Sequence, residues 1–348
     1  MNPTKAYSAA SATSLLASTK INRRNPTEHD VQIEILFCGV CHSDLHAVRD
    51  EWSDFMPAVY PIVPGHEILG RVTKTGSAVT KYKTGDLVAV GCMVDSDGTC
   101  PHCKDGLEQF CPNMTLTYNS PDKHLGGVTY GGYSDSIVVN EHFVLRVPMN
   151  LDPAGAAPLL CAGITTYNAL RNSGAKSGDL VAVQGIGGLG HLAVQFAAKS
   201  GYHTVAISRG KDKEAFAKEL GAHEYIDDAN GDAAQQLQKM GGAKVILATA
   251  PNAKAISGLA GGLKYKGKLL IVAAPHDNVE VSPLLLLMGS RSVAGHYSGY
   301  AKDSEDTLDF AVLTGVRPKV EVFPLAKVNE AYERMLSNKA RFRVVLKM

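Results

Sequence analysis

The sequence has almost no net charge and no long hydrophobic run. Its 35 Lys and Arg residues stand against 34 Asp and Glu residues, which gives a formal charge of +1 at pH 7. A chain without a basic surplus has no general electrostatic attraction to nucleic acid or to an anionic membrane, so a small molecule is the expected partner. The longest apolar stretches, LLIVAA and PLLLLM, are far shorter than the roughly 18 residues that a membrane-spanning helix needs. We therefore expect a soluble protein.

Cysteine is scarce, with seven in 348 residues. Three of them, Cys100, Cys103 and Cys111, lie too close together in the sequence to stabilise a domain of this size through disulfide cross-links. Thiolate ligands in a reducing compartment explain them better, which predicts a cytoplasmic location.

The first 27 residues contain no acidic residue, a composition that also occurs in organelle transit peptides. The segment has no long amphipathic period, however. AYSAA and LLASTKINRR are equally typical of an opening strand and turn.

The hydrophobic pattern changes character near residue 151. From about residue 31 to 150, short β-rich runs are broken by Gly and Pro, which predicts an all-β, barrel-like module. Beyond it, strands alternate with helices, which predicts a parallel sheet with helices on both faces. After about residue 298 we expect two helices, at 303–315 and 327–337, and a strand at 342–348.

A glycine-rich turn follows the first strand of the alternating region. Gly185, Gly187 and Gly190 have G-x-G-x-x-G spacing between the strand DLVAVQ and a helix. Such glycines permit a tight turn, the approach of a diphosphate and close packing of helix on strand. The diphosphate would lie at the helix N-terminus.

The end of the next strand indicates which dinucleotide is bound. Where an acidic residue would bind the ribose of NAD, the chain has Ser208, Arg209 and then Lys213. These groups suit a 2′-phosphate, so NADP is predicted. The alternative is that Arg209 and Lys213 belong to a solvated helix start.

Three further segments hold metal-ligand residue types: GVCHSDLH, PGHEILG and PLLCAGITTY contain Cys41, His66 and Cys161, with Glu67 beside the histidine. Singly, the cysteines are also compatible with buried apolar thiols and the histidine with a surface turn. Together, two thiolates and one imidazole form a zinc site with an open fourth position, the ligand set of alcohol dehydrogenases.

On these motifs, together with CGVCHSDLH, GDLVAVGC, GIGGLGH, NEAYERM and RFRVVL, the chain resembles the zinc-dependent medium-chain alcohol dehydrogenases. Within them it is similar to the cinnamyl-alcohol-dehydrogenase branch of NADP-dependent aldehyde reductases. The resemblance implies a GroES-like β-barrel catalytic domain, residues 1–152 and 299–348, and a Rossmann domain, residues 153–298. It also implies a homodimer formed through the strand near SVAGHYSG.

The resemblance further implies roles for individual residues. Cys41, His66 and Cys161 would hold the catalytic zinc, with Glu67 able to approach it. Ser43 and His46 would relay the proton, since a hydroxyl passes it on without holding charge and imidazole releases it near neutral pH. The residues that would contact the dinucleotide are His42, Thr165, Gly185, Gly187, Gly188, Leu189, Gly190, Ser208, Arg209, Lys213, Thr249 and Arg343. Trp52 and Tyr297 would line the substrate pocket.

The cysteine-rich lobe departs from the family pattern. The family has four cysteines with C-x2-C-x2-C-x7-C spacing around a structural zinc, and Asp97 here occupies the first position before Cys100, Cys103 and Cys111. One interpretation is that the Asp97 carboxylate completes the zinc site. The alternatives are a metal-free lobe or a fourth ligand from Cys92, Asp95 or His102.

The predicted function is reduction of an aromatic or medium-chain aldehyde by NADPH, with zinc polarising the carbonyl. Two alternatives remain open: a zinc polyol dehydrogenase and an NADPH-binding scaffold or sensor without turnover. Trp52 and Tyr60 favour a hydrophobic aldehyde over a sugar.

Overall fold

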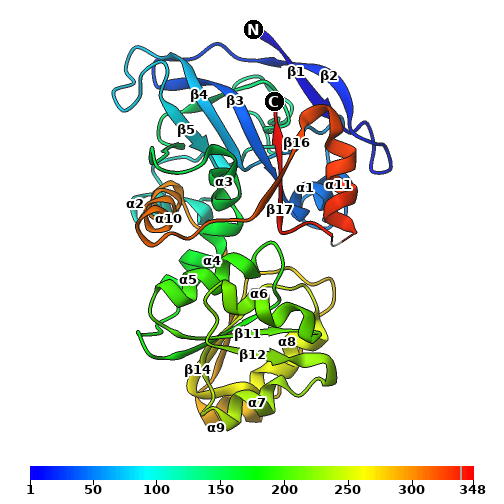
Figure 1. Ribbon diagram of the computed structural model, residues 1–348. Coiled ribbons are helices and arrows are strands. Elements are labelled where there is room, and N and C mark those ends of the chain that lie inside the picture. The colour runs from blue at the N-terminus through cyan, green and yellow to red at the C-terminus, as the bar shows by residue number, and fades with distance from the viewer. Residues whose placement is uncertain (338) are drawn as a thin grey trace. The chain divides into compact units, whose positions relative to one another are not determined.

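The structure is a computed structural model that describes residues 1–337 and 339–348 (Figure 1). The described residues form two compact units. One comprises Met1–Cys161, Gly299–Leu313 and Pro318–Met348, and the other comprises Ala162–Ser298 and Thr314–Arg317. We call them the barrel unit and the α/β unit. The barrel unit extends beyond residue 152, the boundary expected from the sequence, and so includes Cys161.

The barrel unit is built around a seven-stranded sheet with the order β16-β17-β3-β4-β5-β9, in which β8 also pairs with β3. Its strands are β3 (Asp30–Val40), β4 (Ile68–Thr75), β5 (Leu87–Val90), β8 (Ser136–Asn140), β9 (Val144–Arg146), β16 (Val320–Pro324) and β17 (Arg343–Lys347). Alternation along β3 buries Val31, Ile33 and Ile35 on one face, as a strand period of two requires. The beginning of β3 pairs with β8 and its end with β17, so this strand joins distant parts of the chain.

The first 27 residues contain the expected opening strand and, after the turn, a second strand that the sequence did not predict. β1 (Asn2–Ser8) pairs antiparallel with β2 (Ala17–Arg23). The remaining elements of the barrel unit are α1 (His42–Val48), β6 (Met93–Asp95), α2 (Pro101–Lys104), η1 (Glu108–Phe110), β7 (Thr115–Leu116), α3 (Pro153–Ala156), η2 (Ala157–Leu160), α10 (Ala301–Thr314), η6 (Leu325–Lys327) and α11 (Val328–Leu336). The helices α10 and α11 and the strand β17 lie where the sequence predicted two helices and a strand.

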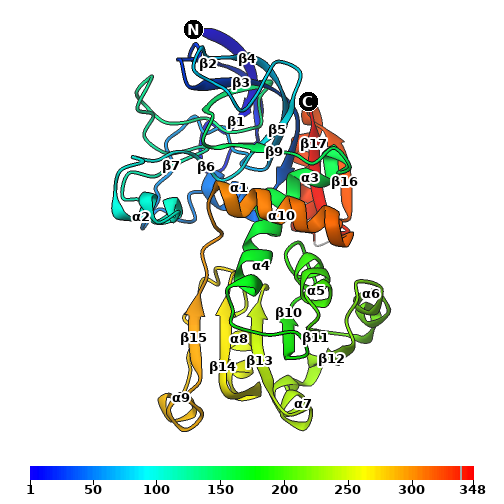
Figure 2. The ribbon, with the colours of Figure 1, turned by 90° about the vertical axis from the view of Figure 1, so that its left-hand side faces the viewer.

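The α/β unit contains a six-stranded parallel sheet with the order β12-β11-β10-β13-β14-β15, which Figure 2 shows side by side. Its strands are β10 (Leu180–Gln184), β11 (His203–Ser208), β12 (Glu224–Asp227), β13 (Ala243–Ala248), β14 (Leu263–Ile271) and β15 (Ser292–Gly295). The order reverses direction between β10 and β13, which is the point where doubly wound sheets bind nucleotides. All five residues of β10 are buried, as expected for a central parallel strand.

One helix, α4 (Ala162–Arg171), precedes the first of these strands. The elements that connect the strands are α5 (Gly190–Lys199), η3 (Lys211–Lys213), α6 (Glu214–Glu219), η4 (Asp228–Asn230), α7 (Ala233–Lys239), α8 (Ala253–Leu259), η5 (Ala260–Gly262) and α9 (Pro283–Gly289). The predicted α/β fold with a parallel sheet is confirmed. Within the described part of the chain, no helix combines the length and the hydropathy needed to cross a bilayer.

Candidate active site and metal centres

Cys41, His66 and Cys161 come together inside the barrel unit. Cys41 caps α1 directly after β3, His66 precedes β4, and Cys161 follows η2. Their ligand atoms and one carboxylate oxygen of Glu67 all lie within 4.8 Å of one another. The Sγ atoms of Cys41 and Cys161 are 3.9 Å apart. Two thiolates on one zinc ion, each bonded at about 2.3 Å, lie about 3.8 Å apart in tetrahedral geometry, so the residues fit this metal.

A buried carboxylate that sequence analysis missed orients the histidine. Asp44 Oδ1 lies 3.0 Å from His66 Nδ1 and also accepts the backbone N–H of Gly65 at 3.0 Å. Its other oxygen, Oδ2, accepts the backbone N–H of Cys41 at 2.9 Å. This arrangement leaves His66 Nε2 for a metal, as in the carboxylate–histidine–metal arrangements of zinc proteins. The sequence signal was the acidic residue three positions after the helix cap at Cys41, the spacing of a capping box.

Glu67 is fully buried and forms an ion pair with Arg343 from β17. Burial raises the pKa of Glu67 to about 7, and the positive charge of Arg343 opposes that rise. Glu67 Oε2 has no hydrogen-bond partner among the described residues, which fits a cation beside it. A Cβ atom at Gly39 would lie 1.8 Å from this oxygen, so only glycine leaves room for the carboxylate. Arg343 therefore contacts Glu67, and its predicted contact with the dinucleotide remains a prediction.

The two residues of the predicted proton relay lie on α1. Ser43 Oγ is 3.6 Å from Cys41 Sγ. His46 Nδ1 bonds with a carboxylate oxygen of Glu51, a partner that the sequence analysis did not identify. The rings of His46 and Trp52 lie 5.1 Å apart, which places the predicted aromatic wall beside the relay. Tyr297 belongs to the α/β unit, and its contribution to the same pocket stays a prediction.

The second group of predicted ligands also comes together. The ligand atoms of Asp97, Cys100, Cys103 and Cys111 all lie within 4.8 Å of one another. Cys100 Sγ accepts the backbone N–H of Cys103 at 3.4 Å, and Cys111 Sγ accepts that of Asn113 at 3.4 Å. This lobe therefore offers three sulfur atoms and a carboxylate close enough together to surround one zinc ion.

The carboxylate of Asp97 is held in place by its neighbours. Its Oδ1 accepts the backbone N–H groups of Cys100 at 2.8 Å and Thr99 at 2.9 Å. These hydrogen bonds, with one from the Asn113 side chain, keep the pKa of Asp97 well below its usual value. The carboxylate therefore has the charged form that a metal ligand requires.

The three alternative ligands make other contacts. Among the described residues, neither Cys92, Asp95 nor His102 belongs to the group around Asp97. The Cys92 thiol interacts with Cys161, and this interaction lowers its pKa. Asp95 pairs with Lys123 at 3.2 Å, and the His102 ring lies 6.4 Å from that of Phe110.

In the α/β unit, the glycine-rich turn joins β10 to α5. Gly185 has φ of 91°, a conformation that favours glycine. A Cβ atom at Gly190 would lie 1.8 Å from the Gly185 carbonyl oxygen, whereas one at Gly187 would meet nothing within 4 Å. Gly190 therefore serves the packing of helix on strand, and Gly187 leaves open space where a diphosphate is expected. The Thr249 hydroxyl donates to the Gln184 carbonyl at 2.8 Å and supports the turn from β13.

Most of the remaining predicted cofactor residues lie in the same unit. Ser208 is the last residue of β11, Arg209 is exposed, and Lys213 ends η3. Leu189 is the N-cap of α5 next to Gly188, and Thr165 lies on α4. His42 belongs instead to α1 of the barrel unit.

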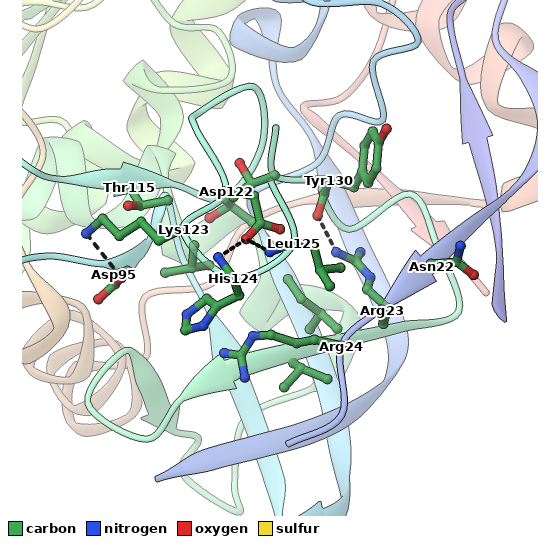
Figure 3. A pocket seen from close by; sticks show the side chains of 15 residues that line it. Asn22, Arg23, Arg24, Asp95, Thr115, Asp122, Lys123, His124, Leu125 and Tyr130 are labelled. Carbon is green, nitrogen blue, oxygen red and sulfur yellow. Dashed lines mark hydrogen bonds and ion pairs between the residues drawn. The ribbon is translucent and has the colours of Figure 1, made fainter. Parts of the chain in front are cut away.

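A separate hollow in the barrel unit is lined by basic and acidic side chains (Figure 3). Of the candidate ligands named from the sequence, its lining includes Asp95 but none of the residues in the two ligand groups. Its cations already have partners. Arg23 donates to the carbonyl of Tyr130, Arg24 pairs with Asp30, and Lys123 pairs with Asp95. The hollow is therefore distinct from the metal centres.

A barrel unit with a Cys2His centre and a Rossmann-like unit with a glycine turn together define the class of zinc-dependent dehydrogenases. Residues 27–149 match the model of the alcohol dehydrogenase GroES-like domain, and residues 188–312 match that of the zinc-binding dehydrogenases. The aldehyde reductase YahK of Escherichia coli is 44% identical over 346 residues, covering 98% of this chain and 97% of that protein. The NADP-dependent alcohol dehydrogenase C 1 of Mycolicibacterium smegmatis is 44% identical over 348 residues, covering 99% of this chain and 98% of that protein.

Among solved structures, a cinnamyl alcohol dehydrogenase of Sorghum bicolor superposes with a TM-score of 0.92 at 38% identity, covering 99% of this chain and 98% of that one. The chain belongs to the zinc-containing medium-chain alcohol dehydrogenases, in the branch of cinnamyl alcohol dehydrogenases and NADP-dependent aldehyde reductases. It is an NADP-dependent alcohol dehydrogenase and aldehyde reductase with zinc and NADP(H) as cofactors, which confirms the predictions of fold class, enzyme and cofactors.

Proposed function

We propose that this enzyme interconverts aromatic or medium-chain aldehydes and their primary alcohols at the cluster of Cys41, His66 and Cys161. The observation that carries the proposal is the convergence of these ligand atoms within 4.8 Å beside Glu67. Bound there, zinc would polarise the substrate carbonyl, or lower the pKa of the alcohol in the reverse direction. Asp44 keeps the His66 ring turned so that Nε2 faces the metal, and Arg343 holds Glu67 in reach of it.

The protein itself moves the proton. Ser43 lies beside the ligand Cys41, so its hydroxyl is placed to donate a proton to the oxygen of the reduced substrate. His46 then restores that proton from solvent, and Glu51 fixes the ring through Nδ1. The second ring nitrogen of His46 is left for the relay.

Cofactor binding is assigned to the α/β unit, except for His42 and Arg343. The turn at Gly185, Gly187, Gly188 and Leu189 would receive the diphosphate at the start of α5. Ser208, Arg209 and Lys213 would bind the 2′-phosphate that distinguishes NADP from NAD. Thr165 and Thr249 would complete the contacts.

The second metal centre is proposed to hold a structural zinc with Asp97 as fourth ligand. A closed site of four ligands stabilises the lobe that contains them and has no position for substrate. The hydrogen bonds that fix Asp97 Oδ1 support this assignment, because they hold the carboxylate in one orientation.

A homodimer is proposed through the outer strand of the α/β sheet. β15 pairs with β14 on one side and with no other described strand. The adjacent helix α9 exposes 65% of Leu284, 75% of Leu287 and 74% of Met288. An unpaired edge next to an exposed apolar helix suits pairing with a second copy across a twofold axis. Leu287→Asp should shift the mass measured by light scattering from dimer to monomer.

A cytoplasmic location is proposed as well. All seven cysteines are free of disulfides, which supports a reducing compartment.

The substrate class is tested with a panel of aldehydes and sugars. Initial rates of NADPH oxidation should be faster with benzaldehyde and hexanal than with fructose. Trp52→Ala should raise KM for benzaldehyde more than for acetaldehyde, whereas Trp52→Phe should retain most of the preference. A preference for fructose over benzaldehyde would instead support a polyol dehydrogenase.

A further inference from the structure

The turn after β11 is attached to the neighbouring strand β12 through Gly210. Gly210 has φ of 81° and ψ of 145°, and its backbone N–H donates to Asp227 Oδ1 at 2.8 Å. Its carbonyl oxygen accepts a hydrogen bond from the Tyr225 hydroxyl. Both polar groups of one glycine are thus held by side chains of β12.

This attachment follows from the sheet register. β11 and β12 are parallel, with Ala206 opposite Tyr225 and Ser208 opposite Asp227. Tyr225 and Asp227 lie two residues apart on β12, so their side chains leave the same face of the strand. Asp227 is itself fixed, because its Oδ1 also accepts the backbone N–H of Ala229 at 3.0 Å.

Gly210 lies between the groups assigned to the 2′-phosphate. Ser208 and Arg209 precede it, and Lys213 follows within the short helix η3. The Ser208 side chain also interacts with the Tyr225 phenol. A glycine with positive φ has many alternative conformations, so an untethered Gly210 would let the two halves of the turn move independently.

We propose that Tyr225 is a positioning residue for NADP selectivity. Its hydroxyl fixes the Gly210 peptide, which keeps Ser208, Arg209 and Lys213 in one arrangement around the 2′-phosphate. This inference rests on the assignment of those three residues under the proposed function. It adds a residue that makes no contact with the phosphate itself.

In this proposal the hydroxyl of Tyr225, rather than its ring, holds the turn in position. Tyr225 is half-buried, and Phe would retain the packing of the ring. Tyr225→Phe therefore removes the bond to the Gly210 carbonyl, together with the interaction of the phenol with Ser208, and leaves the strand intact. Tyr265→Phe is a matched control, because Tyr265 lies in the same unit with 76% of its surface exposed.

The test is calorimetric titration of the full-length enzyme with 2′,5′-ADP, which carries the 2′-phosphate, and with 5′-AMP, which lacks it. In Tyr225→Phe, the affinity for 2′,5′-ADP should fall by about tenfold, the effect of one lost hydrogen bond, while that for 5′-AMP stays unchanged. KM for NADPH should rise with kcat retained, and the preference for NADPH over NADH should fall. Tyr265→Phe should match the wild type in all of these.

Equal weakening of both nucleotides would overturn the proposal, because it would show a general effect on the nucleotide site. Unchanged affinity for 2′,5′-ADP would overturn it as well. Arg209→Ala separates this failure from that of the proposed function. If Arg209→Ala also leaves the binding of 2′,5′-ADP unchanged, the phosphate assignment itself is wrong. If Arg209→Ala weakens it and Tyr225→Phe does not, only the role of Tyr225 is refuted.

Discussion

Asp44 Oδ1 and His66 Nδ1 lie 3.0 Å apart, and both residues are buried. The carboxylate selects the tautomer of His66 that presents Nε2 to a metal, because Nδ1 must carry the proton that Asp44 accepts. The zinc site therefore depends on a residue that is not a ligand.

Asp44→Asn should lower zinc affinity by about 10- to 100-fold, since the substituted amide cannot reproduce the charge that the ligand needs. Zinc release to a chelator, followed by elemental analysis, measures this effect. Asp54→Asn is a suitable control because Asp54 is exposed on the following segment. Zinc retention equal to that of the control would show that Asp44 has no such role.

Glu51→Ala should reduce kcat by about three- to tenfold with little change in KM, because the His46 ring loses the group that fixes it in the proton relay. Glu51→Gln retains an oxygen that can accept the His46 N–H and should lie close to the wild type. Steady-state rates with a saturating aldehyde distinguish the two variants. If Glu51→Ala is as active as Glu51→Gln and the wild type, the relay does not require Glu51.

Two glycines of the cofactor turn should respond differently to alanine. Gly190→Ala should lower the thermal stability of the protein by several degrees, because the new Cβ would overlap the Gly185 carbonyl oxygen. Gly187→Ala meets no protein atom within 4 Å, so it should leave stability unchanged and weaken NADPH binding by tenfold or more. Thermal unfolding without cofactor and direct NADPH titration measure the two effects. Normal NADPH affinity in Gly187→Ala would contradict the proposal that the diphosphate binds at this turn.

The number of zinc ions per chain tests whether Asp97 is the fourth ligand of the cysteine lobe. Freshly purified wild type should contain about two zinc ions per chain, one in each four-residue group. Asp97→Ala should contain about one and unfold at lower temperature, whereas Asp97→Cys should retain both, because thiolate is an equivalent ligand. If the wild type contains a single zinc ion and Asp97→Cys contains two, the lobe is naturally free of metal.

Asp30 should govern part of the acid stability of the barrel unit. Burial raises the pKa of this carboxyl, but hydrogen bonds from Arg24 and Thr27 outweigh it and bring the pKa from 3.8 to about 2. The stabilisation is complete above pH 3.8 and is lost as the pH falls through 2, because the protonated acid cannot keep its ion pair.

Asp30→Asn should therefore lower the free energy of unfolding by about 1–3 kcal/mol near neutral pH. Its difference from the wild type should shrink below pH 3.8. Urea unfolding of both proteins across the acid range, with zinc removed from both, measures this difference. Glu28→Gln, at a neighbouring exposed carboxylate, should show no such dependence.

Residues whose proposed roles depend on their own chemistry could be singled out from the sequence, and the structure brings the ligand atoms of each predicted metal group within 4.8 Å of one another. Cys41, His66 and Cys161 are unusual ligand types in recognisable segments, and Asp97 stands at the regular spacing of a ligand. Asp44 and Glu51 contact a neighbouring histidine. The spacing of Asp44 from Cys41 indicated a helix cap, but spacing did not specify that either side chain would reach its histidine.

The contact of Tyr225 with Gly210 was even harder to predict from the sequence. It spans 15 residues and exists only because β11 and β12 are parallel neighbours in the stated register. The succession of strands and helices was predictable because hydrophobic periodicity is local. The order β12-β11-β10-β13-β14-β15 was not, since strand order depends on long-range packing.

The pairing of β17 with β3 has a consequence for how the molecule can be divided. The barrel unit is discontinuous, and residues 162–298 of the chain separate Cys161 from the segment that returns with β17. A fragment that ends at residue 161 would contain the three catalytic zinc ligands, yet the end of β3 would lose its β17 partner on one edge and keep only β4 on the other, and Glu67 would be buried without Arg343. An isolated, contiguous catalytic domain is therefore not obtainable by simple truncation. A working one would need residue 161 joined to residue 299 through a new linker.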